Sequence, residues 1–369
     1  MERKIWNWQS KEWPNFSYNE NELKALEIQF SKNSGTVSGA FKHVGDNEKE
    51  HLIIEMLSSE ALKTSEIEGE YLDRDSIQSS IKKNLGLHVD NRKIAPAEYG
   101  ISEMMVDLYR NYQKPLTHEQ LFDWHKMLTN GRRDLTDVGK YRTHEDAMQV
   151  VSGRLDKPSV HFEAPPSRAM QNEMEQFITW FNSCHLQETT LLPMAKAGIT
   201  HLYFVSIHPF EDGNGRISRA LAEKSISLSI GQAALISLSK TIEANKKSYY
   251  DALEKNNKTC DITDWLSYFG RTILNAQEET ISLIDFIIEK AKFLDRYANQ
   301  INERQLKVVN RLFAAGPQGF VGGLSAENYI RIAKTSASTA TRDLKDLVDK
   351  KALMKTGALK GTRYWLNIG

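Results

Sequence analysis

Apolar residues recur at intervals of three and four along most of this chain, and this spacing limits the fold more than any other feature of the sequence. Such spacing places the apolar side chains on one face of a helix. Helix-start signals accompany it, as where Thr117 can cap a helix and Gln120 follows three residues later. The pattern predicts a mainly α fold, with helices over residues 49–64, 97–112, 117–129, 168–184, 193–207, 214–229, 246–255 and 261–293.

Residues 139–166 depart from this pattern. Two short runs, QVV and SVHF, alternate in polarity and are separated by a polar stretch that contains glycine. Alternation of this kind is typical of β-strands, and the pair Pro165-Pro166 ends the segment. We therefore expect a β-hairpin that forms a flap on a helical body.

The segment from residue 296 to the end is expected to form a separate unit. Residues 303–315 have helical spacing, glycines interrupt the chain between 316 and 323, and further helical stretches lead to two short runs at the C-terminus. This order of elements resembles a winged helix-turn-helix. From residue 301 onward there are 12 Lys and Arg against 5 Asp and Glu. DNA would suit this basic charge, and an interaction with another protein is the alternative.

The composition is that of a soluble globular protein, with 40% hydrophobic and 26% charged residues and no net charge. Two cysteines, Cys184 and Cys260, are too few for a disulfide framework and are expected to be reduced. The N-terminal residues lack the apolar segment of a signal peptide, and no stretch is long and apolar enough to cross a bilayer. The sequence thus predicts a cytoplasmic protein without membrane contact.

The segment SIHPFEDGNGRISRA, residues 206–220, concentrates polar residues where one predicted helix ends and the next begins. Unpaired backbone N–H groups at a helix start suit a phosphate, and glycines at 213 and 215 let the backbone approach it. Arg216 and Arg219 lie three residues apart and can face one ligand. Asp212 is placed to hold Mg²⁺ beside a phosphate, and His208 suits general-base work.

Each of these residues also has a purely structural interpretation. Asp212 and Asn214 could be turn and cap residues, and the arginines could form a solvated helix face. The combination of all of them makes a site for a magnesium-bound polyphosphate the better interpretation.

Residues 208–219, HPFEDGNGRISR, match the signature HPFx(D/E)GNGRxxR of the Fic domain at every defined position. With the flanking helices and the flap, the resemblance covers roughly residues 95–290. It implies a Fic-type helical core and an enzyme that transfers AMP from ATP to a Ser, Thr or Tyr hydroxyl of a target protein or of itself. Doc-type relatives, which phosphorylate, lack the second glycine and the final arginine, whereas Gly215 and Arg219 are present here.

The resemblance also assigns roles to individual residues. His208 would deprotonate the acceptor hydroxyl, and Asp212 would bind Mg²⁺ that bridges the α- and β-phosphates. The turn Gly213-Asn214-Gly215 would form the anion hole, while Arg216 and Arg219 would hold the β- and γ-phosphates.

Two aromatic residues follow the motif. Tyr249 and Tyr250 could pack on the adenine, although aromatic residues at helical spacing are more often part of the core.

A second motif lies upstream, where residues 64–69, TSEIEG, match the Fic inhibitory pattern (S/T)xxxE(G/N). Thr64 is the first residue of the pattern, Glu68 is its acid and Gly69 its last. The resemblance implies that Glu68 pairs with Arg219 and so competes with the γ-phosphate. We expect an N-terminal module at residues 1–94 with an inhibitory helix at about 50–69, a catalytic core at 95–295, and a winged helix at 296–369.

Several alternatives remain open. The enzyme could also, or mainly, remove AMP from a modified target, with Glu68 positioning water. It could instead be a DNA-binding regulator that uses the Fic core as a nucleotide sensor. Asp343, Asp346 and Asp349 on the second helix of the C-terminal unit would repel DNA phosphates. A homodimer is compatible with this class of Fic protein.

Overall fold

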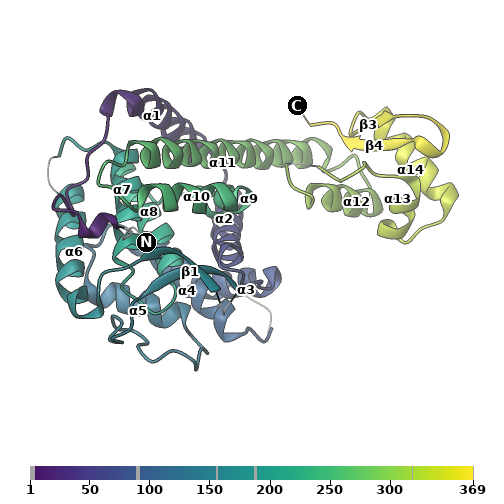
Figure 1. Ribbon diagram of the computed structural model, residues 1–369. Coiled ribbons are helices and arrows are strands. Elements are labelled where there is room, and N and C mark those ends of the chain that lie inside the picture. Colours follow the sequence, from purple (N-terminus) through teal and green to yellow (C-terminus); the bar gives the residue numbers. More distant parts are fainter. Residues whose placement is uncertain (1–4, 89–91, 155–156, 187–188, 318, 369) are drawn as a thin grey trace. The chain divides into compact units, whose positions relative to one another are not determined.

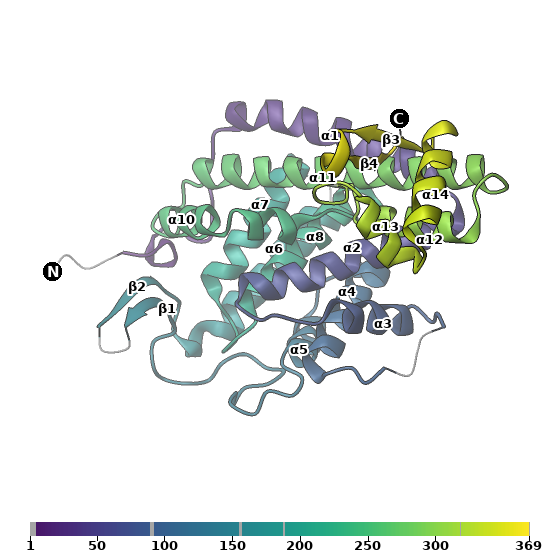
Figure 2. The same ribbon diagram turned by 90° about the vertical axis from the view of Figure 1, so that its right-hand side faces the viewer.

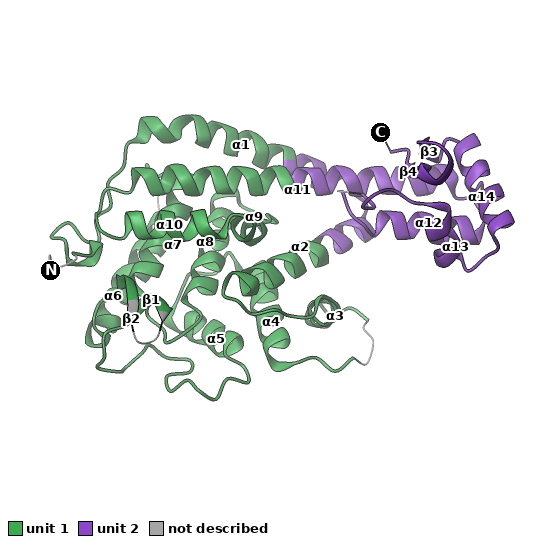
Figure 3. Cartoon of the chain, turned by 45° about the vertical axis from the view of Figure 1, so that its right-hand side comes forward, with its two compact units in different colours: residues 1–36, 53–279 green, residues 37–52, 280–369 purple. Residues whose placement is uncertain are grey.

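The computed structural model describes residues 5–88, 92–154, 157–186, 189–317 and 319–368, and these are mainly helical, which confirms the predicted fold class (Figure 1). The chain divides into two compact units, shown in different colours in Figure 3. Unit 1 consists of residues 1–36 and 53–279, and unit 2 of residues 37–52 and 280–369. The domain boundaries at 94 and 295 stay predictions.

Three long helices contribute residues to both units. They are α1 (Glu20–His43), α2 (Asp46–Ile67) and α11 (Thr263–Tyr297).

The other helices of unit 1 build the body on which the candidate site lies. They are α3 (Arg74–Asn84), α4 (Pro96–Asn111), α5 (His118–Leu128), α6 (Met170–Leu186), α7 (Pro193–Ile207), α8 (Asn214–Ile230), α9 (Leu238–Ala244) and α10 (Lys246–Asn256), with short 3-10 turns at Asn7–Gln9 and Ser167–Ala169.

Helices α7 and α8 pack side by side in the centre of unit 1 (Figure 2). Almost every residue of α7 is buried, because the helix is apolar on all sides and other helices surround it. The segment between them, residues 208–213, is short, so the end of α7 and the start of α8 are held close together. This turn contains most of the residues that the sequence singles out.

The predicted β-hairpin is present, formed by the antiparallel strands β1 (Gln149–Arg154) and β2 (Lys157–Glu163). Its register changes within the strands: Val150 pairs with Phe162, but Val151 pairs with Val160. His161 is therefore the extra residue of a β-bulge. A bulge bends its strand and redirects the side chain at that point.

Unit 2 contains helices α12 (Glu303–Phe313), α13 (Ala326–Ala333) and α14 (Ala337–Asp349), followed by an antiparallel pair, β3 (Leu353–Thr356) and β4 (Arg363–Leu366), with a 3-10 turn at Leu359–Gly361 between the strands. Asn302, Ser325 and Ser336 cap the three helices through their side chains. The order of elements is the one expected from the sequence. The assignment to the winged helix-turn-helix class stays a prediction.

Among the helices of the described ranges, we find none with the length and apolar character needed to cross a membrane.

Candidate active site

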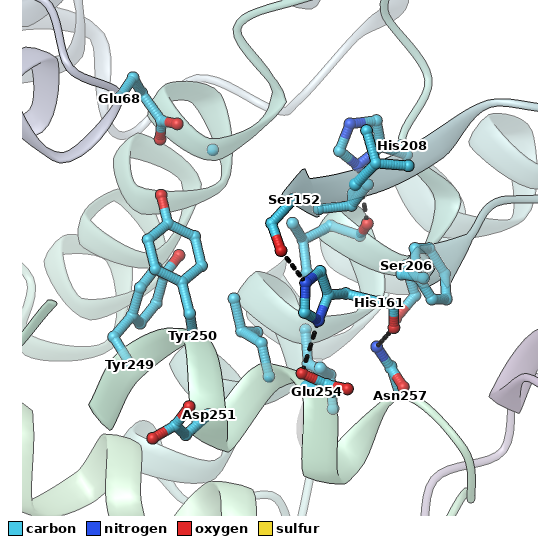
Figure 4. Close-up of a pocket in the computed structure, with 17 residues that line it drawn as sticks. Glu68, Ser152, His161, Ser206, His208, Tyr249, Tyr250, Asp251, Glu254 and Asn257 are labelled. Carbon is cyan, nitrogen blue, oxygen red and sulfur yellow. Dashed lines mark hydrogen bonds and ion pairs between the residues drawn. The ribbon is translucent and has the colours of Figure 1, made fainter. Parts of the chain in front are cut away.

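A cavity of about 530 Å³ opens in unit 1 between the end of α7, the start of α8, helix α10 and the β-hairpin (Figure 4). His208 and Gly215 line one part of it, and Tyr250 and Glu254 of α10 line another. Glu68, which directly follows α2, also reaches this cavity. Segments far apart in the sequence thus meet at one site.

His208 caps the C-terminus of α7 in a left-handed backbone conformation, with φ of 51°. Its Nδ1 lies 3.2 Å from the carbonyl oxygen of Val205, which leaves Nε2 for a ligand. Burial lowers the pKa of His208 to about 4. The imidazole is therefore neutral at pH 7 and able to accept a proton.

The buried side chain of Arg142 holds the backbone around His208. Its Nε donates to the carbonyl oxygen of His208 at 2.8 Å, and its backbone N–H donates to that of Pro209 at 3.0 Å. The two Nη groups donate to Ser167 Oγ and to the carbonyl oxygen of Pro165. Arg142 thus fixes the strained residue that presents the imidazole, a role that the sequence does not reveal.

Hydrogen bonds within the turn after His208 fix its conformation. The Asn214 side chain accepts from the N–H of Phe210 at 3.0 Å and donates to its carbonyl oxygen at 2.8 Å. The Phe210 ring is fully buried and stacks on His125 at 4.3 Å. Gly213, with φ of 81°, donates its N–H to Asp212 Oδ1 at 2.7 Å. The Gly213 N–H is therefore already paired, and the backbone N–H groups of the first turn of α8 are those that suit an anion.

Arg219 of α8 is 1% exposed and lies against the end of helix α2. Its Nη2 contacts Glu68 Oε1 at 2.7 Å and donates to the carbonyl oxygen of Thr64 at 2.9 Å, while Nε donates to Thr64 Oγ1 at 2.8 Å. The structure thus brings residues of the two motifs into contact, although Thr64 and Arg219 are 155 positions apart in the sequence.

Two glycines allow Glu68 to reach Arg219. Gly69, with φ of 84°, ends the turn after α2, a conformation that disfavours other residues. A Cβ atom at Gly215 would lie 2.3 Å from Glu68 Oε1, so only a glycine leaves room for the carboxylate. The local geometry therefore explains why glycine occupies both positions.

Three further ion pairs lie at the site, and the two made by Glu70 and Arg132 are not apparent from the motifs. Arg216 Nη1 lies 2.8 Å from Glu70 Oε2. Asp212 Oδ2 accepts from Arg132 Nη1 at 2.6 Å and lies 3.4 Å from Arg216 Nη2. Burial acts to raise the pKa of Asp212, but Arg216, the Gly213 N–H and Arg132 together hold it below its ordinary value, so the carboxylate is ionised.

Even with these partners, the two arginines retain unused donors. Nη1 of Arg219 and Nε of Arg216 are buried, and within the part of the chain that the structure describes neither has a hydrogen-bond partner. Buried donors of this kind are normally paired. A ligand with several anionic oxygens would satisfy them.

The two tyrosines differ in position. Tyr249 is 1% exposed, belongs to the core and places its hydroxyl 3.0 Å from His201 Nε2. Tyr250 is 38% exposed and donates to the carbonyl oxygen of Ile67 at 3.3 Å. Both border the cavity, but Tyr250 offers more of its ring to a ligand (Figure 4).

Among the described ranges we find no cluster of three or more His, Cys, Asp or Glu that could hold a metal ion. Asp212 holds its carboxylate next to the first turn of α8. Mg²⁺ is usually held by one or two carboxylates together with substrate phosphates. The residues present therefore fit Mg²⁺ that arrives with a nucleotide.

Comparisons with known proteins agree with this geometry. Residues 115–225 match the model of the Fic/DOC family, and residues 6–87 match a domain of unknown function, DUF4172. The chain is 34% identical to protein adenylyltransferase Fic of Drosophila melanogaster over 141 residues. This alignment covers 38% of this chain and 26% of that protein. Over 105 residues the chain is 30% identical to protein adenylyltransferase fic-1 of Caenorhabditis elegans, covering 28% of this chain and 18% of that protein.

Solved structures show the same fold. A Fic family protein from Desulfovibrio desulfuricans aligns with a TM-score of 0.52 at 19% identity, over 92% of this chain and 95% of that one. A fragment of Fic-1 from Caenorhabditis elegans aligns with a TM-score of 0.51 at 19% identity, over 71% of this chain and 74% of that one.

The helical core and the segment that joins α7 to α8 define the Fic class of fold. Residues 115–225 of this chain are a Fic domain. The chain spans about a quarter of the length of its Drosophila relatives, 26% in each case.

Proposed function

We propose that this protein transfers AMP from ATP to a Ser, Thr or Tyr hydroxyl of a target protein. The observation that best supports this is the pair of buried arginines, Arg216 and Arg219, which have unpaired donors and lie in the first two turns of α8. A neutral histidine lies at the same cavity. The relatives named protein adenylyltransferase use the same family of domain.

In this proposal each residue acts on a different part of the reaction. His208 accepts the proton of the acceptor hydroxyl as its oxygen bonds to the α-phosphorus. Pyrophosphate leaves, and Arg216 and Arg219 hold its oxygens. Asp212 would hold Mg²⁺, which neutralises charge on the phosphates. The first-turn N–H groups of α8 stabilise the remaining phosphate oxygens.

The pair of Glu68 and Arg219 makes this an autoinhibited site in our proposal. Arg219 Nη2 forms an ion pair with Glu68. A γ-phosphate must therefore displace this carboxylate before ATP can bind in a productive orientation. Glu68 is 30% exposed at its side chain and directly follows a helix end, so it can move away without unfolding the core.

The position of the radioactive label in ATP tests this function directly. The full chain with Glu68→Gly, incubated with Mg²⁺ and a cell lysate, should label proteins from α-labelled ATP and not from γ-labelled ATP. Label from the γ-position would show a kinase instead. Release of AMP from a previously modified protein by the unaltered chain would show that it also removes AMP by hydrolysis.

In this proposal Glu70 also inhibits the site, but less strongly than Glu68 does. It pairs with Arg216, but its side chain is 38% exposed, where ion pairs contribute only about 0–1 kcal/mol. Glu70→Gln should therefore raise transfer by about twofold to fivefold. Glu55→Gln, whose carboxylate in α2 pairs with Arg74 and not with Arg216 or Arg219, is the control and should have no effect. Equal transfer by the Glu70→Gln and unaltered proteins would contradict a role for Glu70.

Arg142 should act as a positioning residue for His208. Arg142→Lys retains the charge and the backbone hydrogen bond but cannot reproduce the three hydrogen bonds of the guanidinium, so His208 should lose its fixed orientation. We expect kcat to fall by about 10- to 100-fold with little change in the Kd for ATP. Ser167→Ala, which removes a single partner of Arg142, should have a much smaller effect. A parallel loss of ATP binding would indicate a general packing defect instead.

One observation favours DNA binding by unit 2 as a second candidate function. The exposed residues of α14 include Arg342 and Lys345, while Asp343 faces inward. Asp343 is bound by Arg304 Nε at 3.1 Å and by the Tyr329 hydroxyl at 3.1 Å. The outer face of α14 is therefore more basic than its sequence indicates.

A salt titration tests this second function. The affinity of the full chain for duplex DNA should fall steeply with salt, and Arg342→Ala with Lys345→Ala should reduce the slope by about 2. Lys350→Ala, which removes a lysine paired with Asp346, is the control. Binding that does not depend on salt, or no binding, would exclude DNA as the partner.

A further inference from the structure

Ser152, His161 and Glu254 form a hydrogen-bonded chain on one wall of the cavity (Figure 4). Ser152 Oγ lies 2.6 Å from His161 Nε2, and His161 Nδ1 lies 2.7 Å from Glu254 Oε2. Ser152 belongs to β1, His161 to β2 and Glu254 to α10. None of the roles assigned above to the Fic motif uses these three residues.

The backbone fixes His161 in this position. His161 is the bulged residue of the hairpin, and its carbonyl oxygen accepts from Asn257 Nδ2 at 3.1 Å. Asn257 in turn accepts at its carbonyl oxygen from the N–H of Asn7 at 2.9 Å. A β-bulge next to a cavity commonly redirects a side chain toward it. Asn257 therefore holds the backbone of His161, while Glu254 of α10 holds its imidazole.

The order of groups defines their protonation. Glu254 can only accept when ionised, so Nδ1 of His161 has the hydrogen and Nε2 accepts from the Ser152 hydroxyl. A serine is activated as a nucleophile when its hydroxyl donates a hydrogen bond to a histidine whose orientation is fixed by a carboxylate. Ser152 is exposed, and so its oxygen can reach a reagent in the cavity.

We propose that Ser152 is a site at which this protein attaches AMP to itself, with His161 as the base for that step. The proposal rests on the function proposed above, because ATP must occupy the same cavity. Ser152 Oγ forms a bond to the α-phosphorus of ATP, the bond between that phosphorus and the bridging oxygen breaks, and pyrophosphate leaves. The hydroxyl proton moves to His161 Nε2, and Glu254 stabilises the imidazolium that results.

The reaction occurs within one molecule. Ser152 lines the cavity that His208 and Gly215 line, so a nucleotide with its phosphates at the start of α8 lies in the same enclosed space as this hydroxyl. The initial rate per molecule should therefore be the same at any protein concentration.

Peptide mapping tests the proposal with the full chain. After the Glu68→Gly protein is incubated with Mg²⁺ and ATP, trypsin should release residues 143–154, THEDAMQVVSGR, whose hydroxyl groups are those of Thr143 and Ser152. Tandem mass spectrometry should find AMP on Ser152. Ser152→Ala should abolish AMP on this peptide, while Ser159→Ala, across the hairpin from Ser152, should leave it unchanged.

The role of His161 needs its own measurement. In the Glu68→Gly protein, His161→Gln should lower the rate of modification at Ser152 by about 100-fold or more, and Glu254→Gln by less. Since either change could also shift the hairpin, His161→Gly is compared with and without added imidazole. Rescue of Ser152 modification by imidazole is expected of a missing base and not of a displaced hairpin.

The outcomes distinguish this proposal from the function on which it rests. AMP found on other residues or on lysate proteins, but not on Ser152, would overturn the assignment of Ser152 alone. AMP on Ser152 at an unchanged rate in His161→Gln would overturn the role of His161. No AMP on any protein from α-labelled ATP would overturn the proposed function itself.

Discussion

Transfer of AMP by the Glu68→Gly protein is expected to exceed that of the unaltered protein by about 10- to 100-fold. The reason is the 2.7 Å contact between Glu68 and Arg219, whose guanidinium is 1% exposed. A hydrogen bond to a charged group contributes about 1.5–3 kcal/mol, which corresponds to about 10- to 150-fold in occupancy of the competing state. Initial rates with α-labelled ATP measure the difference.

The matched control for Glu68 lies two residues away. Glu66 lies in the last turn of α2, just before Glu68, but its carboxylate accepts a hydrogen bond from Lys63 Nζ. Glu66→Gly should therefore leave transfer unchanged, although it introduces the same flexible residue. Glu68→Gln, which retains the size of the side chain without its charge, should give an intermediate rate. Equal rates for Glu68→Gly and Glu66→Gly would contradict autoinhibition by this pair.

The same pair predicts a change in stability that does not depend on catalysis. Without Glu68 the buried Arg219 guanidinium loses its charged partner at Nη2 and retains its hydrogen bonds to Thr64, so the free energy of unfolding should fall when nucleotide is absent. Phosphate oxygens of ATP can replace the carboxylate. ATP should therefore raise the Tm of the Glu68→Gly protein by more than that of the unaltered protein.

Residues 208–219 are predictable from the sequence because they are contiguous and because each has a chemical reason at its position. Their distant partners are not predictable in this way. Arg142 lies 66 residues before His208, and Glu70 lies 146 residues before Arg216. Nothing in the local sequence separates these two residues from the many other charged residues of the chain. Only the fold brings them to the site.

Helix α1 shows a second limit of local patterns. Residues 31–39, SKNSGTVSG, combine serine, glycine and β-branched residues, which are poor helix formers. The helix nevertheless extends from Glu20 to His43, with Leu23 and Phe30 buried in the core of unit 1. Packing of one face can stabilise a helix that its intrinsic propensity does not favour.

The three aspartates of α14 show why the orientation of a side chain matters. The expectation that all of them oppose DNA is wrong for Asp343, which is 4% exposed and paired with Arg304. Asp346 is half-buried and pairs with Lys350 at 2.6 Å. Only Asp349 of the three is exposed. A list of charges along a helix does not distinguish its inner from its outer face.

Loss of the His208 imidazole should lower transfer in the Glu68→Gly protein by about 10²- to 10⁴-fold, the usual contribution of a general base. ATP binding should remain, because the phosphates contact α8 and its arginines. His208→Asn is the better variant, since asparagine tolerates the φ of 51° that alanine resists by about 1 kcal/mol. Calorimetric titration with ATP and initial transfer rates provide the two measurements.

The pH dependence separates this role from a merely structural one. Burial lowers the pKa of His208 to about 4, so the neutral form that accepts a proton is present above that value and is lost as the pH falls through it. The kcat/KM for transfer should therefore stay level from pH 7 down to about 5, where a histidine with the ordinary pKa of about 6.5 would already be protonated. A decline centred near pH 6.5 would contradict the lowered pKa of His208, and full transfer by His208→Asn would mean that another group takes the proton.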